Sequence, residues 1–284
     1  MTQDEPLPDL AAAAVRLTTP CGGDPHGLSW YRWGEGTGMP VVLFHGGSGS
    51  WRHWARNIAA LAATRPVIAP DLPGLGNSTM PDDPAGPEEA AAALLAGLPL
   101  VVHGRFHLVG FSFGAMVGGL VAARAENLAS PNLASLSLIG PAALGTLRQP
   151  VPLEKLRDKS GTDRREAHRA NLNALMLHKP EAVDETAIAI QEWNTVHARL
   201  RSRGFATSTR LRDALPQVQA PVQAIWGARD AVAWPALHER IDVLRATRPD
   251  ATITTLPETG HWAAYEAPAA VNALLADFFA RHGP

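Results

Sequence analysis

The sequence has very little cysteine, little net charge and no long hydrophobic run. Cys21 is the only cysteine among 284 residues, which excludes a disulfide framework and a thiolate metal cluster. Lys and Arg (25) nearly balance Asp and Glu (27), so the chain has no basic field for nucleic acid or for an anionic membrane surface. No uncharged stretch reaches the ~20 apolar residues that a membrane span needs. We therefore expect a soluble protein whose partners include neither nucleic acid nor a membrane.

The first residues carry acids instead of the basic segment of a secretory signal, so we expect a cytoplasmic protein. A length of 284 residues is large for one core and small for two, which favours one domain with an insertion. The histidines show no HExxH or similar ligand spacing, and we expect no metal and no other cofactor. The expected partner is a small-molecule substrate, and a homodimer stays open.

The stretch FHLVGFSFGAMVGGLVA, residues 106–122, is the part of the chain around which the rest is organised. An apolar run suited to a strand leads through GFSFG into small and aliphatic residues suited to a buried helix. Gly110 and Gly114 flank Ser112 at a distance of two residues, where the missing Cβ lets backbone approach a sharp turn. This pattern predicts that Ser112 is an exposed nucleophile at the end of a strand. Phe113 can then present its backbone N–H to a developing oxyanion at the start of the helix.

A second glycine-rich turn, HGGSG at residues 45–49, follows the apolar run PVVLF. It lacks the lysine of a P-loop and the glycine spacing of a dinucleotide fingerprint, which argues against phosphate binding. We interpret the glycines as permitting close approach to a substrate carbonyl, with the N–H of Gly47 as a second oxyanion donor. His45 is expected to brace this loop.

Apolar runs and helical patterns alternate along most of the chain, which predicts an α/β fold with a parallel sheet. Between residues 142 and 215 the strands stop, charge rises, and two helices are expected at 164–177 and 183–203. Trp193 belongs to an apolar stripe on the second helix. The stripe packs the two helices together, or it lines a substrate pocket beneath them. The other expected helices are 51–61, 87–98, 115–122, 235–247 and 268–281.

Asp230 and His261 each lie just past the end of a predicted strand, as Ser112 does. The carboxyl ends of parallel strands meet at one edge of the sheet, where ligands bind. The order Ser, Asp, His is that of a nucleophile-elbow hydrolase. His261 would take the serine proton and later give it to the leaving group. Asp230 would hold the imidazole in the required tautomer, and the Gly47 and Phe113 amides would stabilise the oxyanion.

The motifs HGGSGSW, DLPGLGNS, GFSFG, WGARD and TGHW, in this order, resemble the α/β-hydrolase superfamily. The resemblance implies an eight-stranded, mostly parallel sheet flanked by helices. It implies Ser112, Asp230 and His261 as catalytic triad and Gly47 and Phe113 as oxyanion hole. It further implies a core of residues 1–141 and 216–284 with a helical cap at 142–215. Trp193 and Trp262 are candidate pocket residues.

The expected activity is hydrolysis of a small or medium carboxylic ester through an acyl-enzyme. Serine at position 112, instead of aspartate, argues against the epoxide hydrolase and haloalkane dehalogenase branches. GHWAAYE, residues 260–266, is similar to the tail of meta-cleavage-product hydrolases, so carbon–carbon bond hydrolysis of a dienone is an alternative. Those enzymes usually carry asparagine and methionine around the serine, where this chain has Phe111 and Phe113.

Two further alternatives use the same fold. One is a ligand-binding receptor, because fold alone does not fix function. The other is a cofactor-free perhydrolase. Cap arginines at positions 199, 201 and 203 are either substrate-carboxylate ligands or part of a solvated helix face, and the second interpretation is favoured.

Overall fold

The computed structural model describes residues 4–83, 85–125 and 132–283. Eight strands form its centre: β1 (Val15–Cys21), β2 (Asp24–Trp33), β3 (Val41–Phe44), β4 (Val67–Pro70), β5 (Arg105–Phe111), β6 (Asn132–Ile139), β7 (Val222–Gly227) and β8 (Thr252–Leu256). They form one sheet in the order β1-β2-β4-β3-β5-β6-β7-β8. β2 pairs antiparallel with β1 and β4, and the remaining neighbours are parallel. The predicted eight-stranded, mostly parallel α/β sheet is confirmed.

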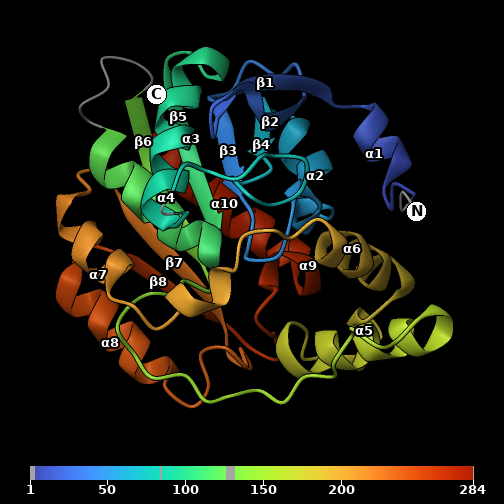
Figure 1. Ribbon diagram of the computed structural model, residues 1–284. Helices are drawn as coiled ribbons and strands as arrows, with labels where there is room; N and C mark the ends of the chain where they lie inside the picture. The colour runs from blue at the N-terminus through green and yellow to red at the C-terminus, as the bar shows by residue number, and fades with distance from the viewer. Residues whose placement is uncertain (1–3, 84, 126–131, 284) are drawn as a thin grey trace.

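The short central strands β3 and β4 are apolar and buried at every position because helices cover both faces of the sheet. In β3, Val42 and Phe44 join one hydrophobic cluster and Val41 and Leu43 join the other, as the alternation of side chains along a strand requires. The first cluster packs against α3 (Pro87–Val101), α4 (Phe113–Ala125) and α8 (Leu237–Thr247), and the second against α2 (Ile58–Ala62) and α10 (Pro268–His282). Figure 1 shows these layers.

Residues 142–215, which connect β6 to β7, contain helices and no strand, as predicted. This β6–β7 segment includes α5 (Gly161–Leu175), α6 (Glu185–Val196) and α7 (Arg210–Ala214). α5 and α6 contact each other beyond one end of the sheet, and α7 contacts α4 (Figure 1). Among the described residues, no helix combines the length and the apolar character needed to span a membrane.

Two helices differ from the sequence-based expectation. The helix expected at 51–61 is a 3-10 turn, η1 (Trp51–Trp54), followed by α2, and such turns are frequent at the N-terminal ends of helices. The Trp51 N–H donates to Asp71 Oδ1 at 2.9 Å. The helix expected at 183–203 ends at Val196. Beyond it, the amides of Arg199 and Leu200 both donate to Gly74 O (2.9 Å), which binds the chain to the loop after β4. The second difference arises from contacts between residues far apart in sequence.

Candidate active site

Ser112 lies at the turn between β5 and α4 with a positive φ of 53°. The turn is possible because its neighbours have no Cβ. A Cβ on Gly110 would lie 2.4 Å from Gly114 O, and one on Gly114 would lie 2.4 Å from His45 O. The Ser112 N–H donates to Ile139 O of the neighbouring strand at 2.9 Å, which fixes the strained residue. The predicted strand–serine–helix turn is therefore present, with the serine at its apex.

The structure brings Ser112, His261 and Asp230 together at the carboxyl edge of the sheet. Ser112 Oγ lies 2.9 Å from His261 Nε2, and His261 Nδ1 lies 2.7 Å from Asp230 Oδ2. Asp230 Oδ1 accepts from the amides of Val232 (2.8 Å) and Ala233 (3.1 Å), which holds the carboxylate in place. His261 and Asp230 are buried. In this geometry the hydroxyl of Ser112 can pass its proton to His261 Nε2, while Nδ1 of the same ring is hydrogen-bonded to the Asp230 carboxylate.

Gly47 and Phe113 lie beside each other near Ser112. A Cβ on Gly47 would lie 3.5 Å from the Cβ of Phe113, and both residues line the same cavity as Ser112. The Phe113 N–H is the first of α4, so the helix offers it no carbonyl partner. Within the described residues, neither amide has a hydrogen-bond partner. The two N–H groups are therefore available to an oxygen atom near Ser112.

Two buried histidines brace the glycine loop. His45 contacts Gly46 O through Nδ1 and accepts the amide of Leu72 through Nε2, both at 2.8 Å. His53 accepts the amide of Gly46 through Nδ1 at 3.2 Å. Burial lowers the pKa of His45 to about 3 and the pKa of His53 well below its usual value. Both rings are therefore neutral and act as loop supports, which is the role expected for His45.

A cavity of about 310 Å³ opens beside Ser112 and His261. One side of it comes from the core, and we call this the core wall. The other side comes from the β6–β7 segment, and we call this the segment wall. The apolar part of the segment wall consists of the side chains of Leu153, Leu156, Leu172, Leu175 and Met176. A substrate with an apolar body of small or medium size fits such a site.

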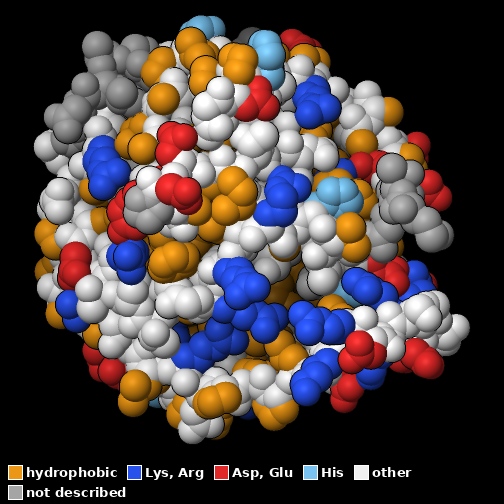
Figure 2. Space-filling view, viewed as in Figure 1, with side chains coloured by type: hydrophobic (Ala, Val, Ile, Leu, Met, Phe, Trp, Pro, Cys, Tyr) orange, Lys and Arg blue, Asp and Glu red, His pale blue; other side chains and the backbone are white. Residues whose placement is uncertain are grey.

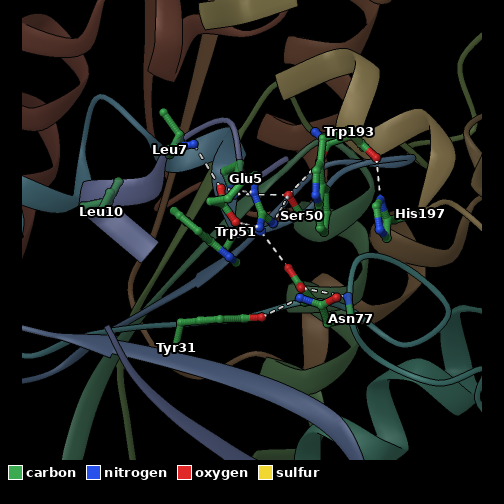
Figure 3. Close-up of polar contacts among 12 residues, drawn as sticks. Glu5, Leu7, Leu10, Tyr31, Ser50, Trp51, Asn77, Trp193 and His197 are labelled. Atoms are coloured by element: carbon green, nitrogen blue, oxygen red, sulfur yellow. Dashed lines mark hydrogen bonds and ion pairs between the residues drawn. The ribbon is translucent and has the colours of Figure 1, made fainter. Parts of the chain in front are cut away.

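Trp193, predicted as a pocket residue, is not among the residues that line the cavity. Its ring lies against the guanidinium of Arg52, with 3.5 Å between Arg52 Cζ and the ring centroid. Arg52 in turn pairs with Glu5 (Figure 3). Because α6 turns Trp193 toward η1, Gln191 and Thr195 of the same helix line the cavity instead. The apolar stripe identified a buried face but not the face that meets the cavity.

Trp262, the other predicted pocket residue, also lies outside the cavity lining. It is fully buried, its Nε1–H donates to His53 O at 2.8 Å, and its ring stacks on Tyr265. Trp262 is adjacent to His261 in sequence, but its side chain points toward His53 and not into the cavity. Trp262 thus links the loop after β8, which carries His261, to η1, which carries His53.

Sequence reasoning missed the polar residues of the segment wall other than Arg203, namely Arg148, His168, Asn171, Gln191, Thr195 and Ser202. Arg148 follows β6, and its position after a parallel strand could have predicted that it lies near the carboxyl edge of the sheet. His168 lies on α5, is buried, and has no hydrogen-bond partner at either ring nitrogen. Burial lowers the pKa of His168 to about 4. Nothing in the local pattern distinguishes His168 or Ser202 from ordinary helix residues.

The three arginines considered in the sequence have different surroundings. Arg203 lines the cavity. Arg199 Nη2 donates to the carbonyls of Gly76 and Ser78, which makes it a support for the loop after β4. Arg201 is exposed and is not among the lining residues. Within the described chain, no three His, Cys, Asp or Glu side chains gather as metal ligands would.

The profile of the α/β hydrolase family matches residues 41–274, which include the serine turn, Asp230 and His261. The chain belongs to this family. It is 32% identical over 294 aligned positions (98% of this chain, 70% of the relative) to the dihydrolipoyllysine-residue acetyltransferase component of an acetoin cleaving system from Pseudomonas putida. It is 30% identical over 267 positions (86% and 89%) to 2-hydroxy-6-oxo-6-phenylhexa-2,4-dienoate hydrolase from Burkholderia cepacia.

Among solved structures, naproxen esterase from Bacillus subtilis has the same fold, with a TM-score of 0.72 and 18% identity over 94% of this chain and 90% of that one. A serine hydrolase involved in carbazole degradation gives a TM-score of 0.70 with 22% identity over 94% and 99%. The α/β-hydrolase resemblance drawn from the sequence motifs is thus confirmed, and the protein is an α/β-fold hydrolase.

Proposed function

We propose that this hydrolase cleaves a small or medium carboxylic ester through an acyl-enzyme. The observation that carries the proposal is the continuous hydrogen-bonded series from Ser112 through His261 to Asp230 at the wall of a largely apolar cavity. Ser112 is the proposed nucleophile, His261 the general base and acid, and Asp230 the group that orients the imidazole.

In the first half-reaction, Ser112 Oγ attacks the ester carbonyl carbon while its proton passes to His261 Nε2. Asp230 stabilises the imidazolium that forms. The carbonyl oxygen becomes negative and accepts hydrogen bonds from the amides of Gly47 and Phe113. The carbon–oxygen bond to the alcohol then breaks, and the alcohol takes the proton from His261. In the second half-reaction water attacks the acyl-serine with the same help, and the acid leaves.

The β6–β7 segment acts in this proposal as a helical cap on a core formed by residues 1–141 and 216–284. Its contribution to the cavity wall supports this role, because Leu172 of α5 and Gln191 of α6 face the same space as Ser112. A cap that covers the reacting carbonyl would exclude bulk water and strengthen the interactions with the oxyanion.

The test is labelling with a fluorophosphonate, measured by intact mass. Wild type should gain one adduct and Ser112→Ala none. Ser208→Ala is the matched control, because the Ser208 hydroxyl donates to Phe205 O and lies outside the cavity lining. It should label as wild type does. Absence of label on wild type, or equal labelling of Ser112→Ala, would rule out Ser112 as the nucleophile.

A second candidate is hydrolysis of a carbon–carbon bond in a meta-cleavage dienone. The 30% identity to a hexadienoate hydrolase over 86% of the chain favours it. The same three side chains would serve, with a carbon leaving group taking up the proton. Turnover of a ring-fission dienone with a kcat/KM at least tenfold above that for p-nitrophenyl esters would favour this candidate. The opposite ratio would favour the ester.

The relative named as an acetyltransferase raises one variation of the ester mechanism. The acyl group on Ser112 could be taken by a thiol in place of water, with His261 again removing the proton. Dihydrolipoamide added to a p-nitrophenyl acetate assay separates the two. Thioester formation in preference to acetate would indicate acyl transfer, and acetate alone would indicate hydrolysis.

A further inference from the structure

Two arginines face the candidate cavity from separate parts of the β6–β7 segment. Arg148 is half-buried on the loop after β6, and Arg203 is exposed in η3 (Ser202–Phe205). Both line the cavity that Ser112 and His261 also line. Figure 2 shows basic side chains gathered around a hollow in the middle of this face. The cavity therefore has a positively charged side.

This charge is not balanced by protein groups. The described residues that line the cavity include no Asp and no Glu. Within the described part of the chain, the side chains of Arg148 and Arg203 have neither an ion-pair partner nor a hydrogen-bond partner. Arg165 and Arg169 on α5 differ, since both pair with Glu185 away from the cavity lining. The two cavity arginines therefore have guanidinium donors available to a ligand.

Asp230 is the nearby acid, and it is already engaged. Burial lowers the pKa of Arg148, the charge of Arg203 lowers it further, and Asp230 acts in the opposite direction. The carboxylate oxygens of Asp230 accept from His261 and from the amide of Val232. A negatively charged ligand between the two arginines would relieve the repulsion without disturbing Asp230.

We propose that the substrate is an organic carboxylate, namely an ester whose own carboxylate binds Arg148 and Arg203 while Ser112 attacks its ester carbonyl. The planar guanidinium forms two parallel hydrogen bonds with a carboxylate, which fixes orientation as well as charge. The apolar body of the substrate would pack on Leu153 and Leu156. This inference rests on the proposed function and names its substrate class.

The first experiment compares esters that differ only in charge. Mono-p-nitrophenyl adipate is matched with p-nitrophenyl 6-methylheptanoate, in which two methyl groups replace the carboxylate oxygens. A second pair carries or lacks a carboxylate on the alcohol side: 4-carboxyphenyl and 4-acetylphenyl hexanoate. In at least one pair wild type should prefer the anion by 10-fold or more in kcat/KM, mainly through KM. No preference in either pair would overturn the proposal.

Variants test whether the arginines cause the preference. Arg148→Gln and Arg203→Gln should each reduce kcat/KM for the preferred anionic ester by about 10- to 100-fold, as expected for loss of charge-assisted hydrogen bonds. The neutral ester should change less than 3-fold. Arg201→Gln is the matched control, because it removes a nearby charge outside the cavity lining and should change neither ester. Equal losses for the anionic and neutral esters would overturn the assignment.

Competition separates a carboxylate from a phosphate. At constant ionic strength, adipate should inhibit turnover of the neutral ester by wild type and lose this effect in Arg148→Gln. Inhibition by inorganic phosphate without inhibition by adipate would overturn the carboxylate assignment. Fluorophosphonate labelling distinguishes failure of the proposed substrate class from failure of the proposed serine-hydrolase function. A labelled Ser112 without charge preference removes only the substrate class, whereas an unlabelled Ser112 removes the proposed function itself.

Discussion

The two walls of the cavity differ in how their polar side chains are engaged. On the core wall, Ser112 and His261 belong to one hydrogen-bonded series. Engagement on the segment wall is mixed. Asn171 and Thr195 are hydrogen-bonded within the protein. Among the described residues, however, His168 has no partner at either ring nitrogen, and the side chains of Arg148 and Arg203 have no ion-pair partner. Groups that are fully bonded in the protein are preorganised for one reaction, whereas unpartnered groups are completed by a ligand. The comparison supports the proposal that the chemistry belongs to the core wall and the recognition of substrate to the unpartnered groups of the segment wall.

The largest expected effect comes from the least exposed member of the core series. Asp230→Asn keeps the size of the side chain but should turn the His261 imidazole toward the wrong tautomer. Hydrolysis of a neutral p-nitrophenyl ester should lose about 10⁴-fold in kcat with little change in KM. Steady-state kinetics on protein with an unchanged melting temperature measure this.

A loss for Asp230→Asn smaller than 10-fold, or one that falls mainly on KM, would contradict the division between the walls. KM effects are expected from the segment wall, where Arg148→Gln is the counterpart. The two variants together show whether the core wall determines kcat and the segment wall determines KM.

The next largest effect is expected where the two walls touch. A Cβ on Gly47 would lie 2.2 Å from Ser202 Oγ and 3.0 Å from Ser202 Cβ, so Gly47→Ala must rotate the Ser202 hydroxyl away and press the loop against the segment. If the Gly47 amide stabilises the oxyanion, kcat should fall by about 100-fold or more. Ester kinetics on the folded variant measure the loss.

The matched rescue is Gly47→Ala combined with Ser202→Gly, which removes the colliding side chain from the segment wall. This double variant should recover at least 10-fold of the lost kcat. If the double variant is as slow as Gly47→Ala alone, the loss does not arise from contact between the walls.

The sequence was more informative about the core wall than about the segment wall, for a physical reason. Ser112, Asp230 and His261 each follow a strand, and the ends of parallel strands meet at one edge whatever the loops do. Trp193 and Arg148 lie in a segment whose orientation depends on tertiary contacts. Helical periodicity showed that Trp193 is buried, but only its contact with Arg52 shows where.

Stability should depend on pH through the neutral histidines of the core. Burial lowers the pKa of His45 to about 3, and burial together with Arg65 lowers the pKa of His107 to about 3. In the unfolded chain each titrates near 6.5, so between pH 6.5 and 3 the unfolded state binds more protons. Stability is therefore complete above pH 6.5 and falls with decreasing pH. From pH 7.5 to pH 5 each histidine should lower the free energy of unfolding by about 2 kcal/mol.

His107 allows a clean measurement because it contacts Ser135 and Phe279 and does not line the cavity. Urea unfolding of His107→Gln should show a pH dependence about 2 kcal/mol smaller than that of wild type over this range. The rate of ester hydrolysis by His107→Gln at pH 7.5 should equal that of wild type. An unchanged pH dependence would show that His107 is not neutral in the folded protein.

The smallest expected effect belongs to His168→Leu, which is compared with the same substitution at His53, a support of the glycine loop. His53→Leu removes the acceptor for the Gly46 amide and leaves a buried N–H unsatisfied, so the free energy of unfolding should fall by about 1 to 3 kcal/mol. His168→Leu replaces a ring with two unpartnered nitrogens by an apolar group. It should leave stability unchanged or raise it by up to about 1 kcal/mol. Urea unfolding at pH 7.5 measures both. If His168→Leu destabilises as much as His53→Leu, the polar groups of the segment wall serve the fold and are not reserved for substrate.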